Sequence, residues 1–228
     1  GKVEQEQEVR DSLLEIGKGG RSRQDLLFLK LAMVSLKQGG RCVMAVPNNV
    51  LFGSTRAHQK IRKQLVERFC IDAIISVDAP VFAPHTRISV SILLFRRPEV
   101  KKPERAEEVI WFYEIEEDGY SGRGRRTPSP NRSDIPDLLK RWRQYKDNGF
   151  TKPPGPKSTE VLDPESSVQC WWTTVAQIDK ETYDLSPSRY RPRTEKEPER
   201  PPEEIIDELE NIEGKIRSDL KKLRSRLN

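Results

Sequence analysis

The order of helix-like and strand-like patterns between residues 26 and 95 limits the possible folds more than any other feature of this sequence. Apolar side chains recur at helical spacing from Leu29 to Leu36, and the Gly39-Gly40 pair is typical of a helix end. The apolar run Cys42 to Val46 has no polar alternate and is closed by Pro47, which predicts a strand covered by helices on both faces.

A second helix and two further strands follow in the same region. Apolar residues spaced by four predict a helix from Ala57 to Phe69, and the apolar runs Ile71 to Val77 and Ile88 to Phe95 predict strands. This αβαβ order predicts an α/β layered domain with a mostly parallel sheet.

The segments that follow the first two strands are candidates for a binding site. Ligands of open parallel sheets bind outside the carboxyl ends of the strands, so the segments Pro47 to Phe52 and Asp78 to Thr86 are expected at one edge. Asn48, Asn49 and Phe82 are the side chains in these segments that could contact a ligand.

The remainder of the chain is poorer in core-forming residues. Hydrophobic and charged residues each make up 34% of the sequence, and its 17 prolines are concentrated late in the chain, so the core belongs mainly to the early part. The run Val109 to Ile115 predicts one more strand, expected beside Ile88 to Phe95 in antiparallel pairing. A helix is expected from Pro136 to Tyr145, and the apolar segment Cys170 to Val175 is expected to pack back on the sheet domain.

The segment from Asp118 to Arg126 is expected to be an exposed loop. It contains Arg123, Arg125 and Arg126 together with Tyr120, and basic residues interleaved with an aromatic ring fit contacts to a nucleic-acid backbone. An ordinary surface loop is the alternative that the sequence leaves open. The net charge of +5 supports DNA contact only weakly, because acidic clusters are interspersed with the basic residues.

The end of the chain is predicted to be a linker and an assembly helix. Residues 193–202 are rich in charge and proline, and residues 203–228 carry an apolar seam with steps of three and four, typical of a coiled coil. Such a seam must be buried, either on another polypeptide or on the chain's own domain. The seam consists of Ile205, Leu209, Ile212, Ile216, Leu220, Leu223 and Leu227.

Three stretches carry a resemblance to a known family. Residues 39–52 read GGRCVMAVPNNVLF and are followed by Val81-Phe82 and the strand SVSILLF, while Tyr183 to Tyr190 reads YDLSPSRY. Together they resemble the second half of the catalytic domain of adenine-N6 DNA methyltransferases, and more narrowly the modification subunit of type I restriction-modification systems. The resemblance implies a class I, Rossmann-like methyltransferase sheet, of which this chain would supply the C-terminal half.

The resemblance implies methyl transfer from S-adenosylmethionine to adenine in DNA. The role that it implies for Phe82 is to stack on the everted target adenine, with Pro47 and Asn48 at the same edge. The alternative reading of Phe82 is a core anchor at a strand entrance. The implied partners are DNA and the specificity subunit, which would bind the C-terminal seam, with the restriction subunit as a further candidate.

Two elements that such enzymes need do not occur in this sequence. One is a glycine-rich loop after a strand, and the other is an Asn/Asp-Pro-Pro-aromatic turn. The two Pro-Pro pairs of the sequence do not form such a turn, because Pro153-Pro154 follows Lys152 and Pro201-Pro202 follows Arg200. The cofactor is therefore expected to bind mainly to an N-terminal part outside this sequence. The chain alone is expected to be inactive, with no catalytic residue of its own, and a non-catalytic scaffold that retains half of the fold is the alternative.

The expected organisation has four parts. No apolar run is long enough to cross a bilayer and no signal peptide is recognisable, so a soluble, cytoplasmic protein is expected. The three cysteines form no CxxC pattern, so no metal site is expected. The parts are the second half of the methyltransferase domain (1–97), a sheet extension with an irregular C-terminal region (98–192), the linker (193–202) and the assembly helix (203–228).

Overall fold

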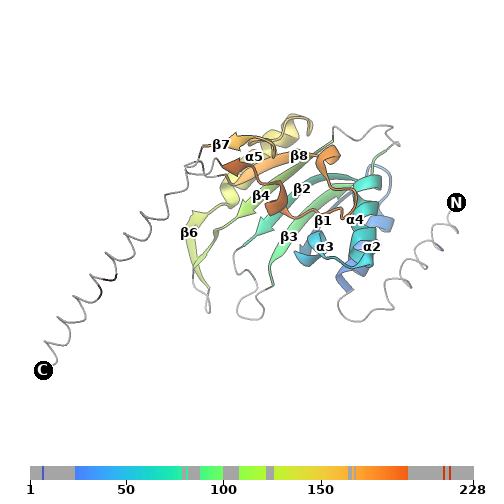
Figure 1. Ribbon diagram of the computed structural model, residues 1–228, viewed down its shortest axis with the longest axis horizontal. Helices are drawn as coiled ribbons and strands as arrows, with labels where there is room; N and C mark the ends of the chain where they lie inside the picture. Colours follow the sequence, from blue (N-terminus) through green and yellow to red (C-terminus); the bar gives the residue numbers. More distant parts are fainter. Residues whose placement is uncertain are drawn as a thin grey trace, which may run out of the picture. The chain divides into compact units, whose positions relative to one another are not determined.

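The computed structural model describes most of the chain between residues 24 and 194 (Figure 1). It forms two compact units, one of residues 1–161 with 167–193 and the other of residues 162–166 with 194–228. None of the helices in the described part is long and apolar enough to span a membrane. The described residues are 24–78, 88–99, 108–121, 126–163 and 168–194, with Gln7, Val81, Ser166, Glu213 and Ile216.

The first unit is built on a five-stranded sheet with the order β1-β3-β2-β4-β8. The class is therefore mixed α/β, as the alternation of helical and strand patterns predicted. The central strand β2 is buried along its whole length, which confirms the strand expected from Ile71 to Val77. The strands are β1 (Arg41–Pro47), β2 (Cys70–Val77), β3 (Val90–Arg96), β4 (Val109–Ile115) and β8 (Cys170–Thr174).

Two predictions about this sheet are wrong. The sheet is not mostly parallel, because only β2 and β4 pair in parallel, whereas the β1–β3, β2–β3 and β4–β8 pairs are antiparallel. Strand β4 also does not lie beside β3. The reason is that β3 lies between β1 and β2 and pairs with both, so it has no edge left for another strand.

Helices cover both faces of the sheet. One face packs against α2 (Gln24–Ser35), α3 (Asn49–Phe52) and α4 (Arg56–Arg68), and α2 and α4 lie side by side (Figure 1). The other face packs against α5 (Ile135–Asp147). Strand β4 serves both layers, because its side chains alternate: those of residues 110 and 112 join the first core and those of residues 111 and 113 join the second.

Strand β1 is not covered on both faces, contrary to the prediction from its apolar sequence. The side chain of Val43 is 68% exposed, and the core beneath α5 includes no residue of β1. Among the described strands, β1 pairs only with β3. The apolar sequence of β1 therefore marks a sheet edge whose outer side and one face have no cover within the described part of the chain.

The later part of the chain contains more strand than was predicted. Where an exposed loop was expected, β5 (Asp118–Ser121) pairs with β6 (Thr127–Ser133) in an antiparallel hairpin. The Cys170 segment does not merely pack on the sheet but forms its last strand, β8. The remaining elements are β7 (Val161–Leu162), β9 (Arg193–Thr194) and the 3-10 helices η2 (Val175–Gln177) and η3 (Pro187–Tyr190).

Candidate functional site

The ends of three strands form one edge of the sheet, which we call the carboxyl edge. Pro47 at the end of β1 and Val77 at the end of β2 both pair with Val90, the first residue of β3. Val77 also pairs with Ile115 at the end of β4. The segments that leave β1, β2 and β4 therefore begin at the same edge, as expected for the first two from the sequence.

Asn48 is fixed to this edge by its neighbour β3. Its backbone N–H donates to the carbonyl of Ser89 at 3.1 Å, and its side-chain Oδ1 accepts a hydrogen bond from Ser91 Oγ at 2.8 Å. The side-chain oxygen is thus already used by the protein, and the amide nitrogen is the group of Asn48 left to donate to a ligand.

A buried arginine holds the turn after β1 in place. The side chain of Arg62 on α4 is 1% exposed, and its guanidinium donates to four backbone carbonyls. Two of them, those of Val50 and Gly53, belong to the segment that follows Asn48, at 3.2 and 2.9 Å. The other two belong to Thr182 and Tyr183, at 2.8 and 2.9 Å. Arg62 therefore joins the segment after β1 to carbonyls that lie 120 and 121 residues after Arg62 itself.

The Tyr183 to Tyr190 segment is the second half of this arrangement. Its Leu185 N–H donates to the carbonyl of Leu51 in α3 at 2.9 Å. Tyr183 has a φ of +50°, a conformation that non-glycine residues adopt at a cost, and its carbonyl is one of the Arg62 acceptors. The YDLS sequence thus supports the turn after β1.

Tyr190 completes the segment from inside the core. Its ring stacks on Phe112 with centroids 5.6 Å apart, and its hydroxyl donates to the carbonyl of Asp184 at 2.6 Å. Burial, reinforced by the negative charge of Asp184, raises the pKa of Tyr190 to about 12.

We expect this raised pKa to appear as a loss of stability in alkali. An unfolded tyrosine has a pKa of about 10, so the buried phenol contributes its full stabilisation below pH 10 and loses it as the pH rises toward 12. Tyr190→Phe should cost about 1 kcal/mol at pH 7 and should flatten the fall in unfolding free energy between pH 10 and 12. Denaturant unfolding across this pH range measures both effects, and parallel profiles for the two proteins would contradict the assignment.

The β5–β6 hairpin leaves the same edge through the end of β4 (Figure 1). Asp134 closes its base, because one carboxylate oxygen accepts from the N–H groups of Glu116 and Glu117, each at 2.9 Å. Within the hairpin, Arg126 pairs with Asp118, and its guanidinium carbon lies 4.9 Å from the centroid of the Tyr120 ring. The guanidinium of Arg126 is therefore engaged within the hairpin.

Several predicted site residues lie outside the described residues. These include Phe82 and the arginines Arg123 and Arg125, so their predicted roles stay predictions. In the C-terminal seam only Ile216 is described, and it is helical with a side chain that is 54% exposed. The other seam residues, Ile205, Leu209, Ile212, Leu220, Leu223 and Leu227, lie outside the described part.

Sequence reasoning missed Arg62, although the sequence carries a signal for it. Arg62 stands four residues after His58 and four before Val66, and both of these are buried. A charged residue at helical spacing within a buried stripe requires hydrogen-bond partners in the interior. What the sequence does not contain is the identity of those partners.

Comparison with known proteins gives one family. A family model described as N-6 DNA Methylase matches residues 2–199. The methylase subunit of the type I restriction enzyme EcoEI from Escherichia coli is 34% identical over 88 residues, which are 39% of this chain and 16% of that protein. The match supports the resemblance that the GGR-strand-PN segment suggested.

Solved structures agree with this comparison at the level of the fold. A structure described as showing complex assembly and conformational transition of the type I R-M system matches with a TM-score of 0.53 and 26% identity, over 91% of this chain and 40% of that one. The type I restriction enzyme EcoKI M protein matches with a TM-score of 0.52 and 18% identity, over 72% of this chain and 37% of that one. The chain thus spans less than half of the length of these relatives.

Proposed function

Because the chain belongs to the N-6 DNA methylase family, we propose that it forms the target-base side of an adenine-N6 DNA methyltransferase. The whole protein would be the modification subunit of a type I restriction-modification system and would transfer the methyl group of S-adenosylmethionine to adenine. The observation that carries the proposal is the arrangement at the carboxyl edge. There Asn48 is hydrogen-bonded to β3, and the segment that contains Phe82 leaves β2 and enters β3 at the same edge. The cytoplasm remains the expected location, because the substrate is DNA.

The proposed task of this edge is to hold an adenine that has left the duplex. The exocyclic amine of a stacked and paired adenine cannot be reached by a methyl donor, so the base must be everted, and stacking on an aromatic ring offsets part of that cost. Phe82 is four residues from Asp78, a separation that can span at most about 14 Å. Asp78 itself is held at the carboxyl edge, since its N–H donates to the carbonyl of Ile115 at 3.0 Å.

The uncovered side of β1 is the observation that favours a sheet continuing into another part of the protein. An unpaired strand edge with apolar side chains is a ready template for a further strand. On α2, which contacts β1, the apolar side chains of Phe28 and Leu31 are also exposed, by 62% and 49%. We therefore propose that a segment outside this sequence pairs with β1 and completes a Rossmann-like sheet of which this chain is the C-terminal half.

The cofactor is proposed to bind mainly to that other part. The glycine-rich loop and the Asn/Asp-Pro-Pro-aromatic turn do not occur in these 228 residues, so the residues present do not by themselves fit S-adenosylmethionine. In the described part, moreover, no cluster of His, Cys, Asp or Glu could hold a metal ion. The contribution proposed for this chain is to orient the base and not to bind the methyl donor.

Because the base and the cofactor are proposed to bind to different parts of the protein, the proposed function can be tested directly. The full-length protein with its specificity subunit should transfer labelled methyl groups from S-adenosylmethionine to adenine in duplex DNA, and the 228 residues alone should transfer none. Digestion of the DNA and chromatography of the labelled nucleosides measure the product. A full assembly that binds DNA without methylating adenine would favour the non-catalytic scaffold instead.

Replacement of Phe82 tests the stacking role. In the full-length protein, Phe82→Ala should lower kcat/KM for methylation roughly 5- to 150-fold, because base–aromatic stacking contributes about 1–3 kcal/mol. It should also weaken the fluorescence increase of 2-aminopurine at the target position, while binding of S-adenosylmethionine is nearly unchanged. Phe82→Tyr retains the ring and should restore both signals. Equal loss of cofactor binding would instead indicate a folding defect and a core role for Phe82.

The basic sequence between β5 and β6 is the proposed contact to the DNA backbone. Arg123 and Arg125 stay candidates for phosphate contacts, since Lys and Arg dominate such contacts. Arg126 also stays a candidate, although its pairing with Asp118 would have to persist or be exchanged on binding. A separate part of the proposal is that the C-terminal seam binds the specificity subunit, with packing on the chain's own domain as the alternative.

A further inference from the structure

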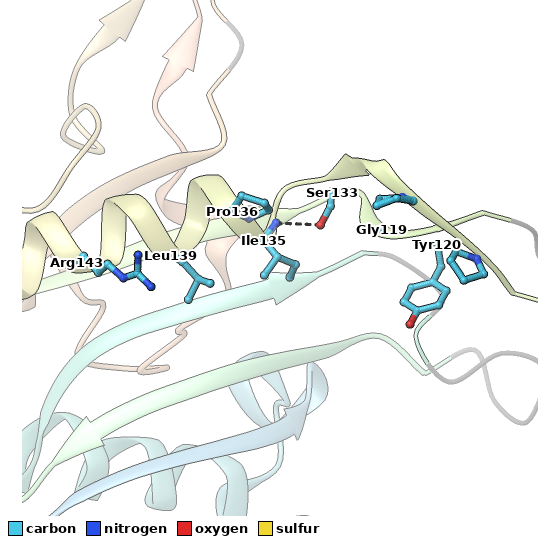
Figure 2. Close-up of a pocket in the computed structure, with 9 residues that line it drawn as sticks. Gly119, Tyr120, Ser133, Ile135, Pro136, Leu139 and Arg143 are labelled. Carbon is cyan, nitrogen blue, oxygen red and sulfur yellow. Dashed lines mark hydrogen bonds between the residues drawn. The ribbon is translucent and has the colours of Figure 1, made fainter.

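A groove with a volume of about 680 Å³ lies between the β5–β6 hairpin and the first turns of α5 (Figure 2). Tyr120, Pro128 and Pro130 line it from the hairpin, and Pro136, Leu139 and Arg143 line it from α5. Figure 2 shows that Leu139 and Arg143 follow one another along the same side of the helix. Of the segment predicted to contact DNA, Tyr120 lines the groove, whereas Asn48 and Arg126 do not.

The lining of this groove is that of a protein interface and not of a DNA-binding surface. Tyr120 is 54% exposed and Leu139 is 45% exposed, so large apolar side chains stand in solvent next to exposed prolines. DNA-binding surfaces are strongly positive, whereas the centres of protein interfaces are rich in aromatic and aliphatic side chains and poor in charge. Here Arg143 is the one charged residue among those that line the groove.

The charges around the groove favour an acidic partner. Three of the nearby acids are already paired with arginines: Asp118 with Arg126, Asp137 with Arg141 at 2.6 Å, and Glu117 with Arg132 at 2.9 Å. The carboxylate of a fourth, Asp134, accepts hydrogen bonds from two backbone N–H groups. Arg143 and its exposed neighbour Lys140 have no acidic partner within the described residues. A carboxylate on the incoming partner would therefore meet an unpaired guanidinium beside an apolar surface.

The hairpin itself favours a helix as the incoming element. A strand could add to β6 only if its backbone offered N–H groups along the edge, but Pro128 and Pro130 have none. An amphipathic helix instead needs a groove that takes its apolar side chains, and no backbone pairing. The volume is within the roughly 300–1,000 Å³ range of well-formed binding pockets.

We propose that this groove binds an acidic amphipathic helix of a second polypeptide in the assembled enzyme. Its apolar side chains would pack against Tyr120 and Leu139, and one of its carboxylates would pair with Arg143. This surface is distinct from the uncovered edge of β1 and from the C-terminal seam.

Site-specific photocross-linking in the full assembly tests the proposal. Benzoylphenylalanine at position 139 replaces an exposed side chain, and irradiation of the full-length protein with its other subunits and DNA would trap whatever lies in the groove. We expect cross-links to a helical segment of another polypeptide that contains Asp or Glu. Arg143→Glu should lower their yield about tenfold or more, which corresponds to about 1.4 kcal/mol, and Arg143→Lys should lower it less.

Matched variants separate this result from nonspecific effects. Lys146→Glu places the same charge change on the same helix at a residue that does not line the groove, and it should leave the yield unchanged. Benzoylphenylalanine at Lys63 on α4 should not give the same product. Cross-links only to DNA or to this chain, no cross-link in the full assembly, or a yield insensitive to Arg143→Glu would each overturn the proposal. Methylation by the same samples reports the proposed function independently.

Discussion

Replacement of Arg62 by methionine is expected to lower the free energy of unfolding by roughly 3–5 kcal/mol. Methionine retains much of the aliphatic stem, so the main loss is that of the guanidinium bonds to four carbonyls, two of them in buried and two in partly buried hydrogen bonds. Such a change should lower Tm by roughly 6–20 °C. Denaturant and thermal unfolding of the full-length protein measure the effect, and hydrogen exchange at the Leu185 amide reports on the segment itself.

Two further variants show whether the geometry of the guanidinium is responsible. Arg62→Lys keeps the charge but offers one nitrogen, which cannot reach carbonyls of Val50 and Thr182 at the same time, so it should recover little stability. Lys63→Met is the matched control, since that side chain is 55% exposed, and its i,i+4 pair with Glu67 and its contact with the Tyr183 ring at 5.9 Å should each contribute less than about 1 kcal/mol. A loss below 1 kcal/mol for Arg62→Met would contradict the proposed joining of the two segments.

Replacement of Leu209, Ile216 and Leu220 by glutamate is expected to abolish co-purification of the partner subunit. Burial of each such side chain contributes roughly 1.5–3 kcal/mol, so the three together account for about 5–9 kcal/mol of the proposed interface. Each new carboxylate would in addition have to lose its hydration. Affinity purification of the tagged full-length protein with its partner measures the association.

The control replaces three residues at seven-residue spacing away from the seam. Asn211, Ser218 and Ser225 changed to glutamate add the same charge to the predicted helix without touching its apolar positions, and the partner should still co-purify. Unchanged co-purification of the seam variant would exclude this helix as the docking element. If the sheet domain of the seam variant unfolds at a lower denaturant concentration, the seam packs on the chain's own domain instead.

The helices and strands could be predicted because their signals are local. The helical spacing around Leu29 and Met33, the glycine pair after it, and the apolar run that became β2 each depend on a few neighbouring residues. The helix ends at Ser35, however, before the glycine pair, and Gly39 takes its φ of +73° in the turn closed by the hydrogen bond from Gly40 N–H to the Lys37 carbonyl. The family resemblance rested on such short stretches as well, and the family comparison supports it.

The order of the strands could not be predicted in the same way. Strands β3 and β4 are consecutive along the chain, and an antiparallel pair would be the shortest connection. The tertiary structure instead places β3 between β1 and β2, where it pairs with both, and β4 pairs with β2. The same limit applies to the hairpin of β5 and β6, whose second strand contains two prolines and shows little strand propensity.

The sequence by itself determined where the helices and strands between residues 24 and 115 form, which family the chain resembles and which residues follow the strand ends, since these depend on neighbours in the chain. The tertiary structure decided which strands share an edge, that β1 has an open side, and that Arg62 joins the turn after Asn48 to the Tyr183 segment. The physical reason is that a buried guanidinium is stable only where carbonyls from distant segments converge on it, and no local pattern encodes that convergence.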